Sequence, residues 1–106
     1  MKKAKHLEGI TAGEILFEEL LRPLNMSQNT LAKALSVPPR RINEIILGKR
    51  RITLDTSIRL GRFFGQTPDY WVRIQQTCDL HNAEDLIKKL TLQIKPYKLP
   101  KEVVPI

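Results

Sequence analysis

A chain of 106 residues is long enough for one hydrophobic core and too short for two independent ones. With 42% hydrophobic and 27% charged residues, the composition is that of an ordinary globular domain and excludes a wholly disordered chain. Eighteen basic against 11 acidic residues give a net charge of +7 at pH 7. This charge favours a polyanionic partner, with nucleic acid first and an anionic membrane surface second.

Signals for export or membrane insertion are weak. Lys2, Lys3 and Lys5 are followed by polar residues such as Glu8 and not by an apolar segment, so we expect no signal peptide. No apolar run approaches the roughly 20 residues of a membrane span. The single cysteine, Cys78, cannot form an intramolecular disulfide. We therefore expect a cytoplasmic protein with no membrane partner.

The first half of the chain carries the pattern of two amphipathic helices. Apolar residues recur at three- and four-residue spacings over residues 13–24, which predicts a first helix. Pro23 and Asn25 near its end are helix breakers. Ser27 is a good N-cap for a short second helix. The inward positions of the second helix are Leu31, Ala32 and Leu35.

A third and a fourth helix follow. Proline is tolerated in the first turn of a helix, so we expect the third helix to begin at Pro38-Pro39 and to end at Gly48. Thr53 can cap a fourth helix, and Gly65 can end it. The expected buried positions of the third helix are Ile42, Ile45 and Ile46.

The fifth helix is expected to open at Pro68 and to carry Trp71, which we assign to packing on the bundle. It continues toward residue 90, either as one helix or, with a bend near Asp79, as two. Residues 91–106 contain three prolines and are interpreted as a short strand around Leu92 and Ile94 or as an irregular tail.

The sequence therefore predicts an all-α fold, a five-helix phage-repressor-like helix-turn-helix bundle with a C-terminal tail. We expect a single domain over residues 1–90 and the tail over residues 91–106. The small Ala32 would let the second and third helices approach closely, as a helix-turn-helix requires. The remaining internal positions of the motif are Leu31, Leu35, Val37, Ile42 and Ile45.

The outward positions of the third helix suit contact with DNA. Arg40 can pair bidentately with guanine and Glu44 can accept from a cytosine amino group, with roughly 1–3 kcal/mol of discrimination for each. Arg41 and Asn43 would either face the groove or bind phosphate. Residues 40–62 contain seven basic and two acidic residues, so the positive charge is concentrated here. The residues expected along the sugar-phosphate backbone after this helix are Lys49, Arg50 and Arg51.

The helix-turn-helix segment and its flanks resemble a known class of DNA-binding protein. The run from Met26 to Lys49 is similar to the phage-repressor (Xre) helix-turn-helix, and the resemblance to the HigA/VapI family of addiction-module antitoxins covers roughly residues 10–84. The sequence departs from that family's usual residues at Ser57 and Cys78. The segments that carry the narrower resemblance include Gly13-Glu14-Ile15-Leu16, Gly48-Lys49-Arg50-Arg51-Ile52-Thr53, Phe64-Gly65 and Asp79-Leu80.

The resemblance implies a site and two partners. Gln28, at the start of the second helix, would contact a phosphate, and Pro39, Arg40 and Glu44 would face the base edges. We also expect Ser27, beside Gln28, to contact phosphate. The second partner would be a co-expressed toxin, an mRNA-cleaving RelE-like endoribonuclease. One helix reads only a few base pairs, so we also expect a homodimer on a palindromic operator, formed through the fifth helix and the tail.

Catalysis is not indicated. Cys78 and His81 lie close in sequence but lack the second His or Cys pair of a zinc site, and the glutamates of the first helix complement its dipole. We predict a non-enzyme without metal or cofactor. Two alternatives remain: a stand-alone repressor with no toxin, and a bundle whose basic face binds an acidic protein or RNA.

Overall fold

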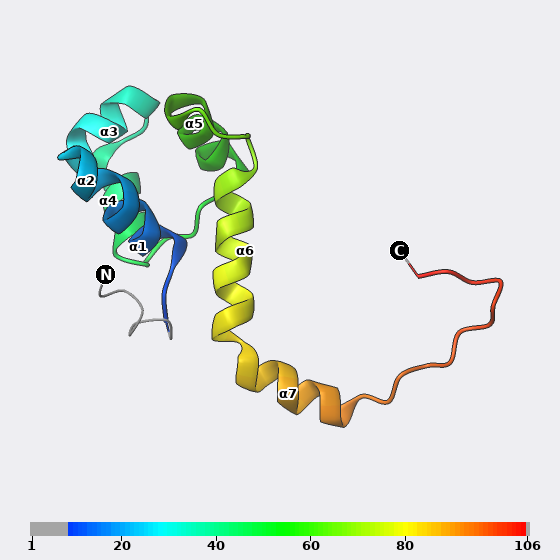
Figure 1. Cartoon of the computed structure of the whole chain (residues 1–106). Helices are drawn as coiled ribbons and strands as arrows, with labels where there is room; N and C mark the ends of the chain where they lie inside the picture. Colours follow the sequence, from blue (N-terminus) through cyan, green and yellow to red (C-terminus); the bar gives the residue numbers. More distant parts are fainter. Residues whose placement is uncertain (1–8, 106) are drawn as a thin grey trace.

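The computed structural model describes residues 9–105, and every regular element in that range is helical (Figure 1). The N-terminal lysines and His6 lie outside the described residues. No helix among residues 9–105 is long and apolar enough to cross a membrane. In chain order the helices are α1 (Ala12–Leu16), η2 (Phe17–Leu21), α2 (Arg22–Leu24), α3 (Gln28–Leu35), α4 (Pro39–Ile46), α5 (Leu54–Phe64), α6 (Tyr70–Asn82) and α7 (Glu84–Gln93).

The predicted first helix is one continuous helical run whose middle turn, η2, is a π-helix. The π-type bond joins the Arg22 N–H to the Phe17 carbonyl. A proline ring clashes with the carbonyl four residues earlier in a regular α-helix, and the wider turn that precedes Pro23 relieves this clash. The run then ends at Asn25, which adopts a left-handed conformation with φ 55°.

The helix-turn-helix consists of α3 and α4. Ser27 caps α3, because its hydroxyl oxygen accepts from the Thr30 N–H at 3.0 Å. Ser36 ends the helix in the left-handed region, and the Val37 N–H then donates to the Ala32 carbonyl at 3.0 Å. Pro39 occupies the first turn of α4, as predicted.

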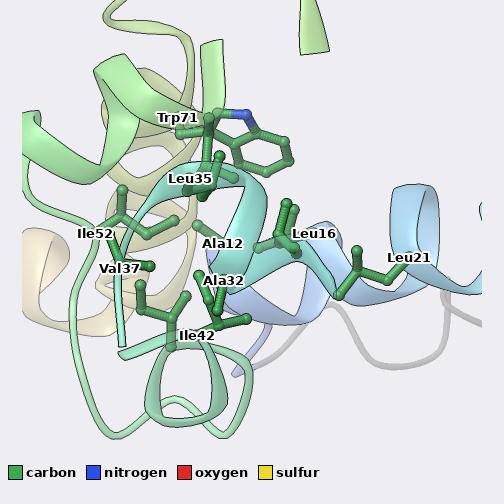
Figure 2. Close-up of a cluster of buried hydrophobic side chains, with 12 residues drawn as sticks. Ala12, Leu16, Leu21, Ala32, Leu35, Val37, Ile42, Ile52 and Trp71 are labelled. Carbon is green, nitrogen blue, oxygen red and sulfur yellow. The ribbon is translucent and has the colours of Figure 1, made fainter. Parts of the chain in front are cut away.

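A single core joins α1, α3, α4, α5 and α6, and Figure 2 shows Ala32 and Ile42 beside Ala12 and Leu16 within it. All six predicted internal positions of the motif are buried, which confirms the interpretation of the pattern. Ile46 is only partly buried, because it lies at the edge of the face of α4 that meets α1. The core residues are Ala12, Leu16, Leu21, Leu31, Ala32, Leu35, Val37, Ile42, Ile45, Ile52, Leu60 and Trp71.

A buried serine joins α5 to α6. The Ser57 hydroxyl donates to the Pro68 carbonyl at 2.7 Å and accepts from the Trp71 N–H at 3.1 Å. Trp71 is 2% exposed and its Nε1 donates to Gln66, so its predicted packing role is confirmed. The start of the fifth helix was predicted two residues early, because α6 begins at Tyr70. The chain just before Tyr70 forms a turn instead, and the Thr67 carbonyl lies against α5.

The helix after Trp71 is divided, but at Ala83 and not near Asp79. The Asn82 side chain at the end of α6 accepts from the Gly9 N–H and donates to the Ile10 carbonyl, which ties this end to the N-terminal segment. The following helix, α7, projects away from the bundle and runs across the expected boundary at residue 90 (Figure 1).

The C-terminal region beyond α7 is irregular, as one of the two interpretations proposed. The alternative of a strand is wrong for the described residues, because Leu92 belongs to α7 and Ile94 begins an extended tail without strand partners. No residue of α7 is buried. The molecule is consequently elongated, with principal extents of 54 × 32 × 22 Å.

Gly13 lies where α1 approaches the end of α4. A Cβ at this position would collide with the carbonyl oxygen of Ile45, which is backbone near the end of α4. We expect Gly13→Ala to lower the free energy of unfolding by about 1–3 kcal/mol, since α1 and α4 must separate. Gln76→Ala, at an exposed helical position, is the control, and chemical denaturation measures both. Gly13→Ala stability equal to or above that of the parent chain would contradict the close approach.

Candidate nucleic-acid interface

The outer face of α4 presents its polar side chains to solvent. Pro39, Arg40 and Asn43 are exposed, and the Arg40 side chain retains 83% of its accessible surface. The opposite face of the same helix is anchored in the core by Ile42 and Ile45. The face expected to read bases is therefore exposed, and packing of the opposite face in the core fixes the orientation of α4.

Glu44 lies between two arginines. Its Oε2 accepts from the Arg40 Nε at 2.9 Å, and its Oε1 accepts from the Arg50 Nε at 2.9 Å and lies 2.8 Å from the Arg50 Nη2 in an ion pair. The hydrogen bond from Arg40 lowers the pKa of the Glu44 carboxyl most, followed by that from Arg50, while desolvation acts in the opposite direction. Glu44 thus remains a carboxylate, and both of its oxygens are engaged within the chain.

Arg41 points toward α5 and not along the exposed face of α4. Its guanidinium donates to the Asp55 carboxylate at 3.2 Å and more weakly to the Thr56 hydroxyl at 3.5 Å. Arg59 donates to the same Asp55 oxygen at 2.8 Å and to the Leu35 carbonyl at 2.9 Å. Arg59 and then Arg41 lower the pKa of Asp55 against the effect of desolvation. A groove contact by Arg41 would require it to leave this cluster.

The segment after α4 is attached to α6. Arg51 donates two hydrogen bonds to the Asp79 carboxylate, at 3.3 and 2.7 Å. Next to it, the Gln75 amide accepts from the Ile52 N–H at 2.7 Å and donates to the Ile52 carbonyl at 2.8 Å. The Arg51 contact lowers the pKa of Asp79 and raises that of Arg51 itself. In the free protein Arg51 therefore stabilises the junction with α6, and its expected phosphate contact stays a prediction.

Asn43 and the start of α3 form a small polar group. The Asn43 Nδ2 donates to the Gln28 Oε1 at 3.1 Å, which brings two candidate DNA-contacting residues from different helices together. Ser27 uses its hydroxyl oxygen for the α3 cap and its proton for the Thr30 hydroxyl. Further contact to DNA by Ser27 would have to share this oxygen.

Positive charge remains after the ion pairs are counted. Glu44 and Asp55 each bridge two arginines, so each cluster carries an excess of one positive charge. Lys49 is exposed and makes no ion pair with residues 9–105. An exposed polar helix flanked by cations is an arrangement that can enter a major groove while neighbouring residues bind phosphates.

Sequence reasoning missed most of these internal contacts. The Arg40 and Glu44 pair is four residues apart on one helix, and this spacing could have indicated it. The pairing of Glu44 with Arg50 depends on how the chain turns after α4, and that of Arg51 with Asp79 spans 28 residues. Neither has a local sequence signal.

Comparison with known proteins places this geometry in a family. The helix-turn-helix family profile matches residues 17–71. Virulence-associated protein I of Dichelobacter nodosus is 49% identical over 78 residues, which are 74% of this chain and 72% of that protein.

Similar solved structures support the same family assignment. An addiction module antidote protein of a HigA family from Coxiella burnetii superposes with a TM-score of 0.76 and 43% identity, covering 85% of this chain and 99% of that one. The Pseudomonas aeruginosa antitoxin HigA with higBA promoter gives a TM-score of 0.74 and 34% identity, covering 82% of this chain and 96% of that one. This chain therefore belongs to the HigA/VapI family of addiction-module antitoxins, within the phage-repressor (Xre) class of helix-turn-helix proteins.

Proposed function

We propose that this chain is a cytoplasmic, homodimeric antitoxin that represses its own operon and neutralises a co-expressed RelE-like mRNA-cleaving toxin. The observation that carries the DNA-binding part is the outer face of α4, which exposes Asn43 and Arg40, the latter in a cluster of two arginines and one glutamate with excess positive charge. The related HigA of Pseudomonas aeruginosa, solved with promoter DNA, supports the same role for this fold.

The accessible side chains define the division of labour that we propose. Arg40 pairs with a guanine, while Pro39 and Asn43 lie against neighbouring base edges. Gln28 and Lys49 bind phosphates on either side of the groove. Three further candidates contact DNA only by sharing or leaving partners inside the chain: Ser27, Arg41 and Arg51.

Dimerisation through α6, α7 and the tail completes the proposal. Leu80, Leu86 and Ile87 are 64%, 53% and 45% exposed, and α7 contacts only α6 appreciably. Apolar surface of this kind gains free energy when a second copy covers it. Pairing two chains also doubles the number of base pairs read, which a palindromic operator would match.

Replacing Arg40 tests the base-reading assignment. We expect Arg40→Ala to lower the preference for the chain's own upstream DNA over a scrambled duplex by roughly 10- to 100-fold, the discrimination of one bidentate contact. Arg73→Ala removes another exposed arginine that also has an acidic partner four residues away, and serves as the control. Fluorescence anisotropy titrations of both duplexes measure the effect. Unchanged discrimination by Arg40→Ala would show that another residue reads the site.

Lys49 should behave differently from Arg40. Because Lys49 is exposed and makes no ion pair within residues 9–105, it would act through phosphate charge, and Lys49→Ala should weaken binding to specific and scrambled DNA alike. The slope of log K against log salt should become less steep by about 1 for each chain bound. A salt series of titrations measures this slope. A loss confined to the specific duplex would contradict a phosphate contact.

Toxin neutralisation is tested with the product of the adjacent open reading frame. If that product is the toxin, its expression alone should arrest growth, and co-expression of this chain should restore it through a complex that purifies intact. We place toxin binding outside the outer face of α4, so Arg40→Ala should restore growth equally well. If the adjacent product neither arrests growth nor binds this chain, the stand-alone repressor becomes the correct alternative.

A further inference from the structure

We propose that Glu44 is a positioning residue for DNA recognition: its carboxylate orients Arg40 toward the bases and Arg50 toward the backbone, and Glu44 does not itself read a cytosine. The inference rests on the proposed function, since it concerns how the same face of α4 recognises an operator. It replaces the base contact that the sequence pattern indicated for Glu44 with a contact inside the protein.

The contacts with Glu44 leave different guanidinium nitrogens of Arg40 and Arg50 free. Arg40 uses Nε for Glu44, at 2.9 Å, so both of its terminal nitrogens remain available on the solvent side. Those two nitrogens form the fork that matches the O6 and N7 of guanine. Arg50 donates Nε to the carboxylate, its Nη2 lies 2.8 Å from the same oxygen, and its Nη1 is not engaged by Glu44. Nη1 can donate to a phosphate oxygen, but Arg50 does not present the pair of free terminal nitrogens that Arg40 presents.

The Glu44 side chain is less exposed than the two arginines that it contacts. The Glu44 side chain is 23% exposed, against 83% for Arg40 and 46% for Arg50. The Glu44 side chain is therefore less accessible to an approaching duplex than either arginine side chain. A base contact by Glu44 would require one of its two oxygens to give up a charge-assisted hydrogen bond.

The net charge of the cluster also favours a positioning role for Glu44. The negative field of DNA disfavours an unpaired carboxylate in the groove, whereas the cluster of two arginines and one glutamate retains one positive charge. Holding a long side chain in one rotamer before binding also reduces the entropy that it loses on contact. Glu44 can thus strengthen recognition without touching DNA.

The main chain supports the same role. The Glu44 carbonyl accepts from the N–H groups of Lys49 and Arg50, at 2.8 and 3.2 Å. The residue therefore fixes the turn after α4 through its backbone, while its side chain fixes the arginine at the end of that turn. Substitution of the side chain leaves these backbone bonds in place, so the variants test the carboxylate alone.

A double-mutant cycle on base discrimination tests the proposal. Affinities of the wild-type chain, Glu44→Ala, Arg40→Ala and the double variant are measured on the upstream operator and on duplexes with each base pair changed in turn. We expect Glu44→Ala to lose several-fold discrimination at the base pair that Arg40→Ala relaxes, and the double variant to lose no more there than Arg40→Ala. A uniform loss of affinity with no change in base discrimination, which a purely structural role would cause, would contradict the orientation of Arg40 by Glu44.

Other outcomes overturn the proposal. If Glu44→Ala relaxes a different base pair and its effect adds to that of Arg40→Ala, then Glu44 reads a base directly. If it leaves discrimination unchanged, the ion pairs have no role in recognition. Glu44→Gln, which retains the shape and one acceptor oxygen, should fall between wild type and Glu44→Ala, and it replaces Glu44→Ala if circular dichroism shows that variant unfolded. A wild-type chain with no preference for its upstream DNA would instead refute the proposed function itself.

Discussion

The close approach of the first helix to the end of α4 is the constraint on which the recognition face depends. Gly13 lies against the Ile45 carbonyl with no room for a side chain, so α1 and α4 meet backbone to backbone. Ile42 and Ile45 hold the same helix from the core side. The orientation of α4, and with it the direction in which Arg40 points, follows from these contacts and not from the turn of the motif alone.

Two amide side chains of α6 extend this constraint to the rest of the molecule. Gln75 binds both backbone polar groups of Ile52, and Asn82, two turns later, binds the backbone of Gly9 and Ile10. Each amide satisfies one donor and one acceptor, so neither backbone segment is left without partners. The helix that carries the proposed dimer surface at its far end is thereby tied to both the entry to α1 and the exit from α4.

Much of this arrangement could be predicted from the sequence. The positions of Leu31, Ala32 and Ile42 follow from helical periodicity, and the helix ends at Ser27 and Pro39 follow from capping and proline chemistry, because these are local effects. The break at Ala83 and the start of α6 at Tyr70 depend on tertiary packing, which no local pattern encodes, whereas the π-turn follows locally from Pro23, which sequence reasoning treated only as a helix breaker.

The candidate site shows the same division. Exposure of Arg40 and Asn43 was predictable, because a helix with Ile42 and Ile45 inside must display them. The carboxylate partners of Arg40, Arg41 and Arg51 were not all predictable. Two of these pairs join different elements, and a basic cluster in the sequence does not reveal which of its charges are already used. The structure therefore separates accessible cations from arginines that stabilise the fold.

Hydroxyl-radical footprinting of the wild-type chain on its own upstream DNA tests the central claim most directly, because it reports which backbone positions the protein covers without any substitution. The account predicts two protected segments on one face of the duplex, centred about one helical turn or a multiple of it apart, as two copies of α4 in successive major grooves require. Absence of protection, or a single protected segment without two-fold symmetry, would contradict it.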